Sequence, residues 1–407
     1  MAETILPNGL CVLTEGIPGV RSAAVGVWVR QGAAHERPKV MGASHLLEHM
    51  VFKGTRCRTA REIALALESL GGSLDAYTSR EHTSYQARVL DEHLPQALDV
   101  LADLVLDPLL RDADLALEKE VVLEEIATVE DTPDDLVFDL HGARFWNDHP
   151  YGHSILGSRE TVADMPGDAL RGLHQDTYRG RNLLVAAAGN VQHTEVVDRV
   201  GALFGSVPAG ETAQELPDPP PPPRGEEHIR RDSAQSHLVF GGAIPSHSDP
   251  RRYALVLLSQ VLGGGMSSRL FQRIREELAL AYSVYTFQSF YARGGLFGIY
   301  VGTRPRTVRK AADTVREELA RIAEKGLSEL ELDQTKQQVK GQIMLSLEST
   351  GARLFRLAGF ALHRERFIGL DELLGRFDAL TLDEVSLLAG EFLSPERHFL
   401  LSLGPTG

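Results

Sequence analysis

The sequence predicts an α+β protein made of two related units, and three observations lead to that prediction. The chain has 407 residues, enough for two or more domains that each bury a core. The unbroken run Pro219–Pro223 can join neither a helix nor a central strand, so it predicts a linker over about 207–227. On both sides of this linker a strand-like stretch precedes a Gly-rich turn and an amphipathic helix. This parallel order predicts an internal duplication, with one domain over 1–206 and its homologue over 228–407.

Hydrophobic periodicity and turn residues predict the elements of each half. An Asn8-Gly9 pair predicts an opening hairpin. The expected strands lie at 22–33, at 73–90 (one or two strands around a polar bend) and at 237–245. The expected helices lie at 43–54, 61–72 and 112–131, with a Gly-interrupted helical segment at 255–278.

Charge is distributed unevenly along the chain. Residues 1–215 carry 18 basic and 33 acidic residues, whereas 216–407 carry 24 and 23. An acidic surface repels phosphate backbones and attracts cations and basic peptides. We therefore expect no nucleic-acid partner, and we expect any peptide substrate to be basic.

Cysteine content and hydropathy restrict the compartment. Cys11 and Cys57 form no C-x-x-C pair and no disulfide framework, so zinc held by thiolates is not expected. The N-terminus lacks a basic segment followed by an apolar one, and no stretch is apolar over the roughly 18 residues of a membrane span. These features predict a soluble, cytoplasmic protein without a membrane partner.

The most informative segment is the H-x-x-E-H motif formed by His45, Glu48 and His49. On a helix, positions i, i+3 and i+4 share a face, so both imidazoles can direct a nitrogen at one ion while Glu48 lies beside it. That arrangement is typical of a zinc half-site with a general base. The alternative is a helix with two solvated or core histidines.

Two histidines leave a hydrolytic zinc site one protein ligand short. The helix expected at 112–131 offers four candidates, Glu118, Glu120, Glu124 and Glu125. Helical periodicity places two of them, Glu118 and Glu125, on an inward apolar stripe with Val121, Val122, Ile126 and Val129. An inward carboxylate needs a partner, whether a metal or a structural salt bridge. Glu120 and Glu124 lie off the stripe, and we expect them in solvent.

The order H-x-x-E-H reverses the H-E-x-x-H order of most zinc proteases. In this respect the chain resembles the inverted-motif zinc peptidases, which include pitrilysin, insulin-degrading enzyme and the mitochondrial processing peptidase. Its length resembles that of the smaller bacterial and processing-peptidase-like members. Segments similar to those of the family follow in family order, namely LPNGLCVLTE, GASHLLEHMVFKGT, LDAYTSREHTSY, EKEVVLEEI, HPYGHSILG, LGGGMSSRLFQRIREELALAYSVY and FLSPERHFLLSLGP. The resemblance implies two α/β-sandwich domains in a clamshell arrangement.

The resemblance also assigns roles at the site. The family's third ligand lies about 76 residues after the second histidine, which selects Glu125, and its other recurrent glutamate lies seven residues earlier, at Glu118. The implied site is one Zn²⁺ per chain held by His45, His49 and Glu125. Glu48 would activate water for peptide hydrolysis, and Glu118 would orient a ligand.

Two further regions receive roles only through the resemblance. The segment Leu74, Asp75, Ala76 and Tyr77 resembles the edge strand on which the family pairs its peptide, although many relatives have Asn in place of Asp75. Arg275 and Tyr282 match a pair that holds the substrate backbone and the developing oxyanion. From the residues alone, 73–90 is an ordinary hairpin, Arg275 a solvated helix residue and Tyr282 a strand residue packed on the sheet.

Two alternatives to a self-sufficient peptidase follow from the same family. One is a non-catalytic structural or peptide-binding subunit, which the intact His45, Glu48, His49 and Glu125 argue against. The other is the catalytic subunit of an obligate heterodimer. Because Arg275 and Tyr282 are also present, the sequence favours a homodimer. Gly263–Gly265 precede no Gly-Lys-Ser/Thr, so they predict a turn rather than a phosphate-binding loop.

Overall fold

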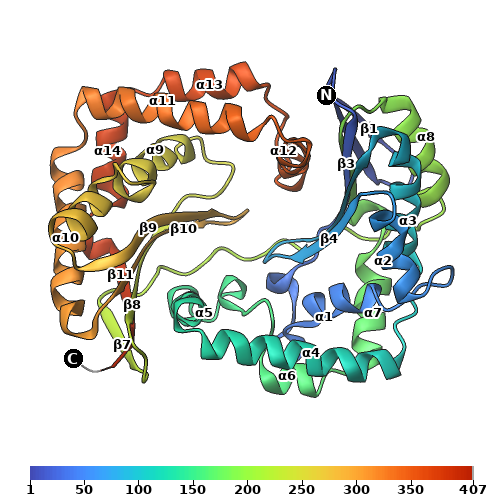
Figure 1. Ribbon diagram of the computed structural model, residues 1–407, viewed down its shortest axis with the longest axis horizontal. Coiled ribbons are helices and arrows are strands. Elements are labelled where there is room, and N and C mark those ends of the chain that lie inside the picture. Colours follow the sequence, from blue (N-terminus) through green and yellow to red (C-terminus); the bar gives the residue numbers. More distant parts are fainter. Residues whose placement is uncertain (406–407) are drawn as a thin grey trace. The chain divides into compact units, whose positions relative to one another are not determined.

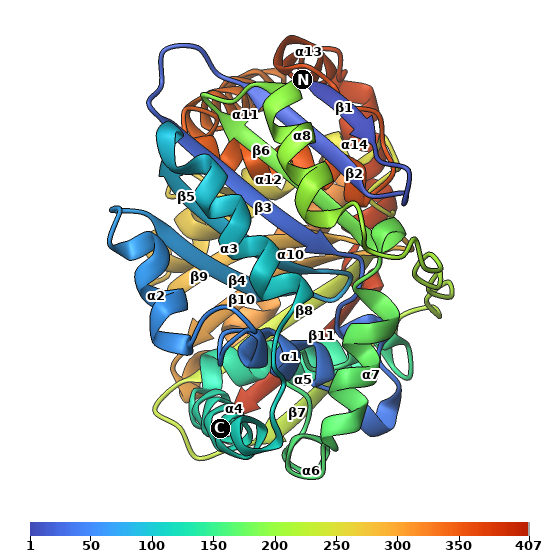
Figure 2. The same ribbon diagram turned by 90° about the vertical axis from the view of Figure 1, so that its right-hand side faces the viewer.

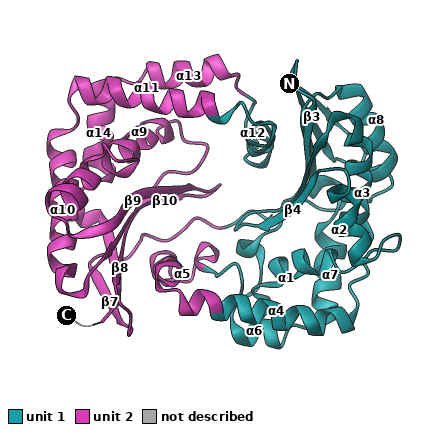
Figure 3. Ribbon diagram, in the orientation of Figure 1, with its two compact units in different colours: residues 1–127, 153–216, 346–367 teal, residues 128–152, 217–345, 368–407 magenta. Residues whose placement is uncertain are grey.

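The computed structural model describes residues 1–405 and divides into two compact units (Figure 3). Unit 1 comprises 1–127, 153–216 and 346–367; unit 2 comprises 128–152, 217–345 and the chain from 368 onward. The boundary between 216 and 217 falls within the expected linker, and residues 208–224 form neither helix nor strand. The units differ from the two sequence halves, because each half contributes one helical segment to the other unit.

Unit 1 is built on a six-stranded sheet. Its strands are β1 (Ala2–Ile5), β2 (Cys11–Gly16), β3 (Ser22–Val29), β4 (Ser73–Thr78), β5 (Thr83–Leu90) and β6 (Leu183–Gly189). Its helices are α1 (Ala43–Val51), α2 (Ala60–Glu68), α3 (Leu94–Leu106), most of α4 (Asp112–Asp131), α6 (Arg159–Ala163), α7 (Gly167–Thr177), α8 (His193–Phe204) and α12 (Thr350–Leu362). Figure 2 shows α3 and α8 lying across the strands, and the main core fills the space between these layers.

Unit 2 is built on a five-stranded sheet. Its strands are β7 (Glu226–Arg230), β8 (Ser236–Ile244), β9 (Ala281–Phe290), β10 (Gly295–Thr303) and β11 (His398–Gly404). Its helices are α5 (Pro133–Trp146), α9 (Arg252–Gly263), α10 (Val308–Lys325), α11 (Glu329–Ser346), α13 (Leu370–Asp378) and α14 (Leu382–Phe392), with a short π-helix at Phe271–Glu277.

The two sheets correspond strand for strand, as an internal duplication requires. Unit 1 has the order β1-β2-β6-β3-β5-β4 and unit 2 the order β7-β11-β8-β10-β9. In each sheet one pair is parallel, β2 with β6 and β7 with β11, and every other pair is antiparallel. The additional strand β1 forms the predicted hairpin with β2, and Gly9 adopts the positive φ of 85° that this turn needs. The predicted α+β class and duplication are confirmed.

The exchanged helices each cover one face of a sheet. Helix α5, from the first half of the sequence, packs on β8 and β11. Helix α12, from the second half, packs on β2, β3 and β6, where Leu354 and Leu357 join Trp28 in a second core cluster. The half-buried Arg30 donates hydrogen bonds to the carbonyls of Ala361 and Leu362, both at 2.7 Å, and so caps the C-terminal end of α12.

Most predicted elements appear, with one correction. The long helix α4 has the predicted bounds, but Val121 is 44% exposed rather than inward. The buried residues of the helix recur every three or four positions, that is, about once per turn, and so form only a narrow stripe. They are Leu115, Glu118, Val122 and Ile126. The interruption expected in 255–278 is present, since α9 ends at Gly263 and helical structure resumes at Arg269. Among residues 1–405, no helix combines the length and the apolar character needed to cross a membrane.

Candidate metal centre

Helix α1 places the three residues of the H-x-x-E-H motif on one side. Its other side is fixed in the core by Leu46, Leu47 and Met50, which are almost completely buried. The polar side therefore cannot rotate away from its neighbours. Figure 1 shows α1 lying over α4, the helix that carries the candidate third ligand.

The structure brings His45, His49 and Glu125 together. The Nε2 atoms of His45 and His49 each lie 3.7 Å from a carboxylate oxygen of Glu125, and one ligand atom from each of the three residues lies within 4.8 Å of the others. Donors that bind one zinc ion at about 2.0–2.2 Å lie roughly 3–4 Å apart, so these positions fit a single ion. Burial lowers the pKa of His45 to about 4, aided by the nearby His49, so its imidazole is neutral and able to bind a metal at pH 7.

Glu118 lies behind His49 and is buried. Its Oε2 is 3.2 Å from His49 Nδ1, and its Oε1 is 2.5 Å from Lys53 Nζ. A carboxylate can only accept this hydrogen bond, so His49 carries a proton on Nδ1, and its Nε2 faces Glu125. Glu120 and Glu124, in contrast, are exposed, as the periodicity predicts.

Glu48 lies beside the two histidines and is held from another element. Its Oε2 accepts a 2.6 Å hydrogen bond from the hydroxyl of Thr78, the last residue of β4. Burial raises the pKa of Glu48, while the Thr78 hydrogen bond and the charge of His49 oppose that rise. One carboxylate oxygen is thus fixed by Thr78, which leaves Oε1 as the oxygen available to a proton donor.

Lys53 and Thr78 are contacts that the sequence analysis missed. Lys53 follows His49 by four residues, a spacing that brings side chains together at a helix end. Thr78 directly follows the candidate substrate residues Leu74–Tyr77 and ends the same strand. From the sequence alone neither position differs from an ordinary surface residue, because the contacts with Glu118 and Glu48 are visible only in the structure.

The predicted peptide strand forms an open edge of the unit 1 sheet. Leu74, Asp75, Ala76 and Tyr77 all belong to β4, which pairs with β5 on one side and with no other strand among the described residues. The Tyr77 hydroxyl lies 2.9 Å from Nε2 of the half-buried His82. The edge runs directly into Thr78, so the open strand and the hydrogen bond to Glu48 belong to one element.

Arg275 and Tyr282 contact one another in unit 2. The Arg275 guanidinium donates a 3.1 Å hydrogen bond to the Tyr282 carbonyl and lies 4.3 Å from the centre of the Tyr282 ring. Tyr282 is 74% exposed, so it does not pack against the sheet as the residue pattern alone suggests. The metal-site residues and this pair belong to different units.

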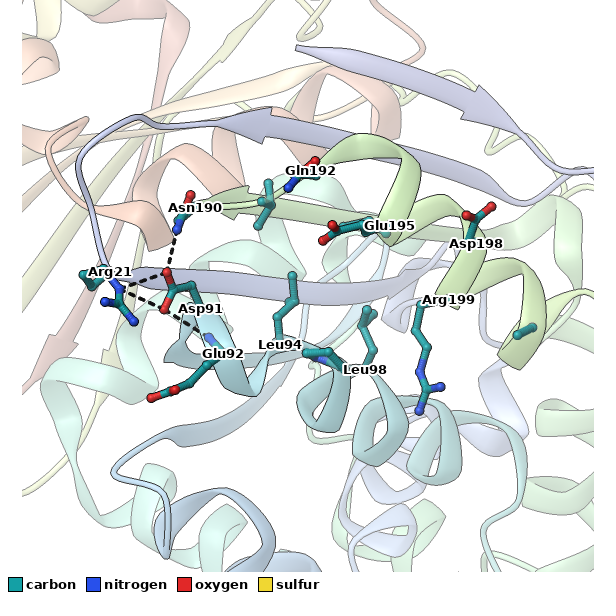
Figure 4. Close-up of a pocket in the computed structure, with 14 residues that line it drawn as sticks. Arg21, Asp91, Glu92, Leu94, Leu98, Asn190, Gln192, Glu195, Asp198 and Arg199 are labelled. Carbon is teal, nitrogen blue, oxygen red and sulfur yellow. Dashed lines mark hydrogen bonds and ion pairs between the residues drawn. The ribbon is translucent and has the colours of Figure 1, made fainter.

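A cavity of about 840 Å³ in unit 1 contains none of these residues (Figure 4). It lies between α3 and α8, over an apolar surface that includes Leu94, Leu98 and Val196. At its rim, Arg21 and Asn190 both bind the carboxylate of Asp91, which lowers the pKa of Asp91. The residues that line this cavity are therefore different from those of the metal centre.

A His-Glu-His helix facing a glutamate of a second helix, on a duplicated α+β fold, defines the class of inverted-motif zinc-peptidase proteins. Comparison with known families agrees with this class. The family model described as "Insulinase (Peptidase family M16)" matches residues 11–159, and the model described as "Peptidase M16 inactive domain" matches residues 164–339. The chain belongs to the insulinase family, peptidase family M16.

Individual relatives span the whole chain. An uncharacterized zinc protease of Bacillus subtilis is 40% identical over 98% of this chain and 97% of its own length. An uncharacterized zinc protease of Streptomyces coelicolor is 39% identical over 99% of this chain and 89% of its own length. A crystal structure of a peptidase M16 inactive domain from Pseudomonas fluorescens superposes with a TM-score of 0.94 at 22% identity, covering 100% of this chain and 98% of that one. A protease from Helicobacter pylori gives a TM-score of 0.91, also at 22% identity, with 99% of both chains covered. At this identity the two structures show the shared fold alone.

Proposed function

We propose that this protein is a zinc-dependent metallopeptidase that hydrolyses peptide bonds. The observation that carries the proposal is the convergence of His45, His49 and Glu125 with Glu48 beside them. Zinc held by the first three residues would act as a Lewis acid, making water a nucleophile at neutral pH and polarising a carbonyl.

Glu48 supplies the general base. Its Oε1 takes a proton from water and returns it to the leaving amine, while Thr78 holds Oε2. The raised pKa of Glu48 favours this double role, because a base of higher pKa binds the proton more readily. Glu118, held by Lys53, keeps the His49 ring in the orientation and tautomer that a metal requires.

Peptide binding is assigned to two places. The open edge of β4 would pair with the substrate backbone through Leu74, Asp75, Ala76 and Tyr77. The pair of Arg275 and Tyr282 would hold the substrate backbone and donate to the oxyanion. Pairing through the backbone selects an extended conformation more than a particular sequence.

The substrate class and assembly state belong to the same proposal. Residues 1–215 contain 33 acidic but only 18 basic residues. This excess of negative charge favours basic peptides, such as unfolded presequence-like segments. Because one chain contains both the metal residues and the Arg275–Tyr282 pair, we propose a homodimer rather than an obligate heterodimer.

Glu48→Gln tests the proposal directly. The variant keeps the shape of the side chain and all three metal ligands, so zinc content should equal that of the parent. Cleavage of a basic fluorogenic peptide should fall by about 10²–10⁴-fold, the usual worth of a general base. Glu124→Gln, an exposed carboxylate-to-amide change on α4, is the matched control. Turnover by Glu48→Gln close to that of the control would remove Glu48 as the base.

A further inference from the structure

Glu36 is a buried carboxylate outside the H-x-x-E-H motif, nine residues before His45. The residue is only 7% exposed. Its Oε2 accepts a 2.7 Å hydrogen bond from the backbone N–H of Gly42, and its Oε1 accepts a 2.6 Å hydrogen bond from the backbone N–H of Ser44. Both donors lie at the start of α1, the helix that carries His45, Glu48 and His49.

Helix α1 needs an external cap. The first N–H groups of any helix have no partner within the helix, and here the N-cap residue is Gly42, which has no side chain to supply one. The helix has only nine residues, too few to be stable on its own in water. Glu36 provides both the acceptor oxygens and a negative charge at the positive end of the helix dipole.

The segment that carries Glu36 is itself fixed on the β4–β5 turn. The N–H groups of Ala33 and Ala34 donate to the carbonyls of Ser79 and Arg80, at 3.0 and 2.8 Å. At Gly32 a Cβ atom would lie 2.4 Å from the Ser79 carbonyl oxygen, so the approach of these backbones requires glycine. Glu36 therefore connects the start of α1 to the hairpin whose residue Thr78 holds Glu48.

Burial of this carboxylate opposes its ionisation. Burial raises the pKa of Glu36 to about 7, and its hydrogen bonds to Ser44 and Gly42 act in the opposite direction. A buried carboxylate costs free energy unless hydrogen bonds offset the loss of water. Here the offsetting bonds all come from Gly42 and Ser44, at the start of the helix that contains His45.

We propose that Glu36 is a positioning residue for the metal centre, which orders the first turn of α1 so that His45 and His49 face one ion before that ion binds. The inference rests on the proposed zinc site but not on peptide hydrolysis. It makes a loop residue, rather than the metal, responsible for arranging the histidines. Metal binding then loses little free energy to the ordering of the helix.

The test compares zinc affinity of Glu36→Gln and the parent by competition with a chelating dye, on metal-free protein. Glutamine accepts only one of the two N–H bonds and turns its own amide donor toward the other. We expect zinc to bind about 5- to 30-fold more weakly, the range for losing a cap and its charge. Glu62→Gln is the matched control, because Glu62 accepts a 2.8 Å hydrogen bond from the Thr59 N–H at the start of α2, away from the metal residues. Equal zinc affinity in Glu36→Gln and the parent would overturn the inference.

A second measurement decides the question even where the variant does not fold. In the metal-free parent, the amides of Gly42 and Ser44 should be protected from hydrogen exchange, since Glu36 binds them without metal. Exchange at the rate of unprotected amides would overturn the inference. Both readouts are made without a peptide. A parent that binds zinc but cleaves nothing would contradict the proposed peptidase function and leave the role of Glu36 standing.

Discussion

Among the glutamates of α4, the partner of each carboxylate decides its chemistry. Glu118 is buried between His49 and Lys53, Glu125 faces both histidines from the half-exposed side, and Glu124 is exposed. All three are glutamates on the same helix, so residue type alone does not distinguish their roles. Their positions on the helix do.

Glu125→Gln should lower the zinc content much more than Glu124→Gln. Removing a ligand leaves two histidines, which bind zinc far more weakly than a three-ligand set, whereas Glu124 contributes no ligand atom. Elemental analysis after dialysis against metal-free buffer measures the difference. Greater zinc loss in Glu124→Gln would show that the wrong carboxylate has been assigned.

Thr78→Val should slow catalysis without removing metal. Valine keeps the shape of threonine but cannot donate to Glu48, and a hydrogen bond to a charged group is worth about 1.5–3 kcal/mol. We therefore expect kcat to fall by about tenfold or more, with unchanged zinc content and little change in KM. Thr78→Ser retains the hydroxyl and should recover most of the rate. Equal losses in both variants would show that the hydroxyl is not the cause.

The sequence predicts part of this site and misses part, for a physical reason. Periodicity identifies Glu118 and Glu125 because the buried stripe of a helix repeats every three or four residues. Periodicity does not identify Thr78 and Glu36, because their hydrogen bonds join elements that come into contact only through the sheet register and the path of a loop. For Val121 the prediction from periodicity is wrong, since this apolar residue has the expected spacing but lies beyond the edge of the buried stripe.

At the level of elements, α5 buries an ionisable side chain against the sheet of unit 2. His141 is 1% exposed and packs beside Phe145 and Phe399. It fits because position 241 is glycine, where a Cβ would lie 2.2 Å from the His141 ring. Burial lowers the pKa of His141 to about 4. A hydrogen bond from the His141 ring to the backbone of Phe399 opposes this shift, and the charge of His398 adds to it.

This burial predicts loss of stability in acid. Between pH 6.5 and 4 the unfolded chain binds a proton at His141 that the folded chain excludes, so folding weakens as pH falls through this window. From pH 6.5 to pH 5 the loss amounts to at most about 2 kcal/mol for this residue. Urea unfolding at both pH values, in the parent and in His141→Gln, measures it. The variant should show a smaller pH dependence, and an unchanged one would contradict the assignment.

At the scale of the whole molecule, the chain exchanges helices between its two duplicated units. The duplication itself follows from the repeated order of strand, turn and helix, and both sheets confirm it. The exchange of α5 and α12 does not follow from the sequence. Their apolar faces show that each covers a surface, but not which of two similar sheets provides it.

The exchange predicts that a chain cut in its linker stays together. A protease site inserted in the segment 211–215, which is exposed except at Ala213, would separate the halves covalently. The C-terminal fragment would still supply α12 to unit 1, and the N-terminal fragment would still supply α5 to unit 2. After cleavage the two fragments should co-elute in size-exclusion chromatography and separate only in denaturant. Separate elution under native conditions would contradict this view of the fold.

The most direct test of the central claim is zinc content by elemental analysis, combined in one preparation with cleavage of a basic fluorogenic peptide. The account predicts about one zinc per chain and cleavage that a chelator abolishes and added zinc restores. Protein that retains no zinc when zinc is supplied, or cleavage that a chelator does not affect, would contradict it.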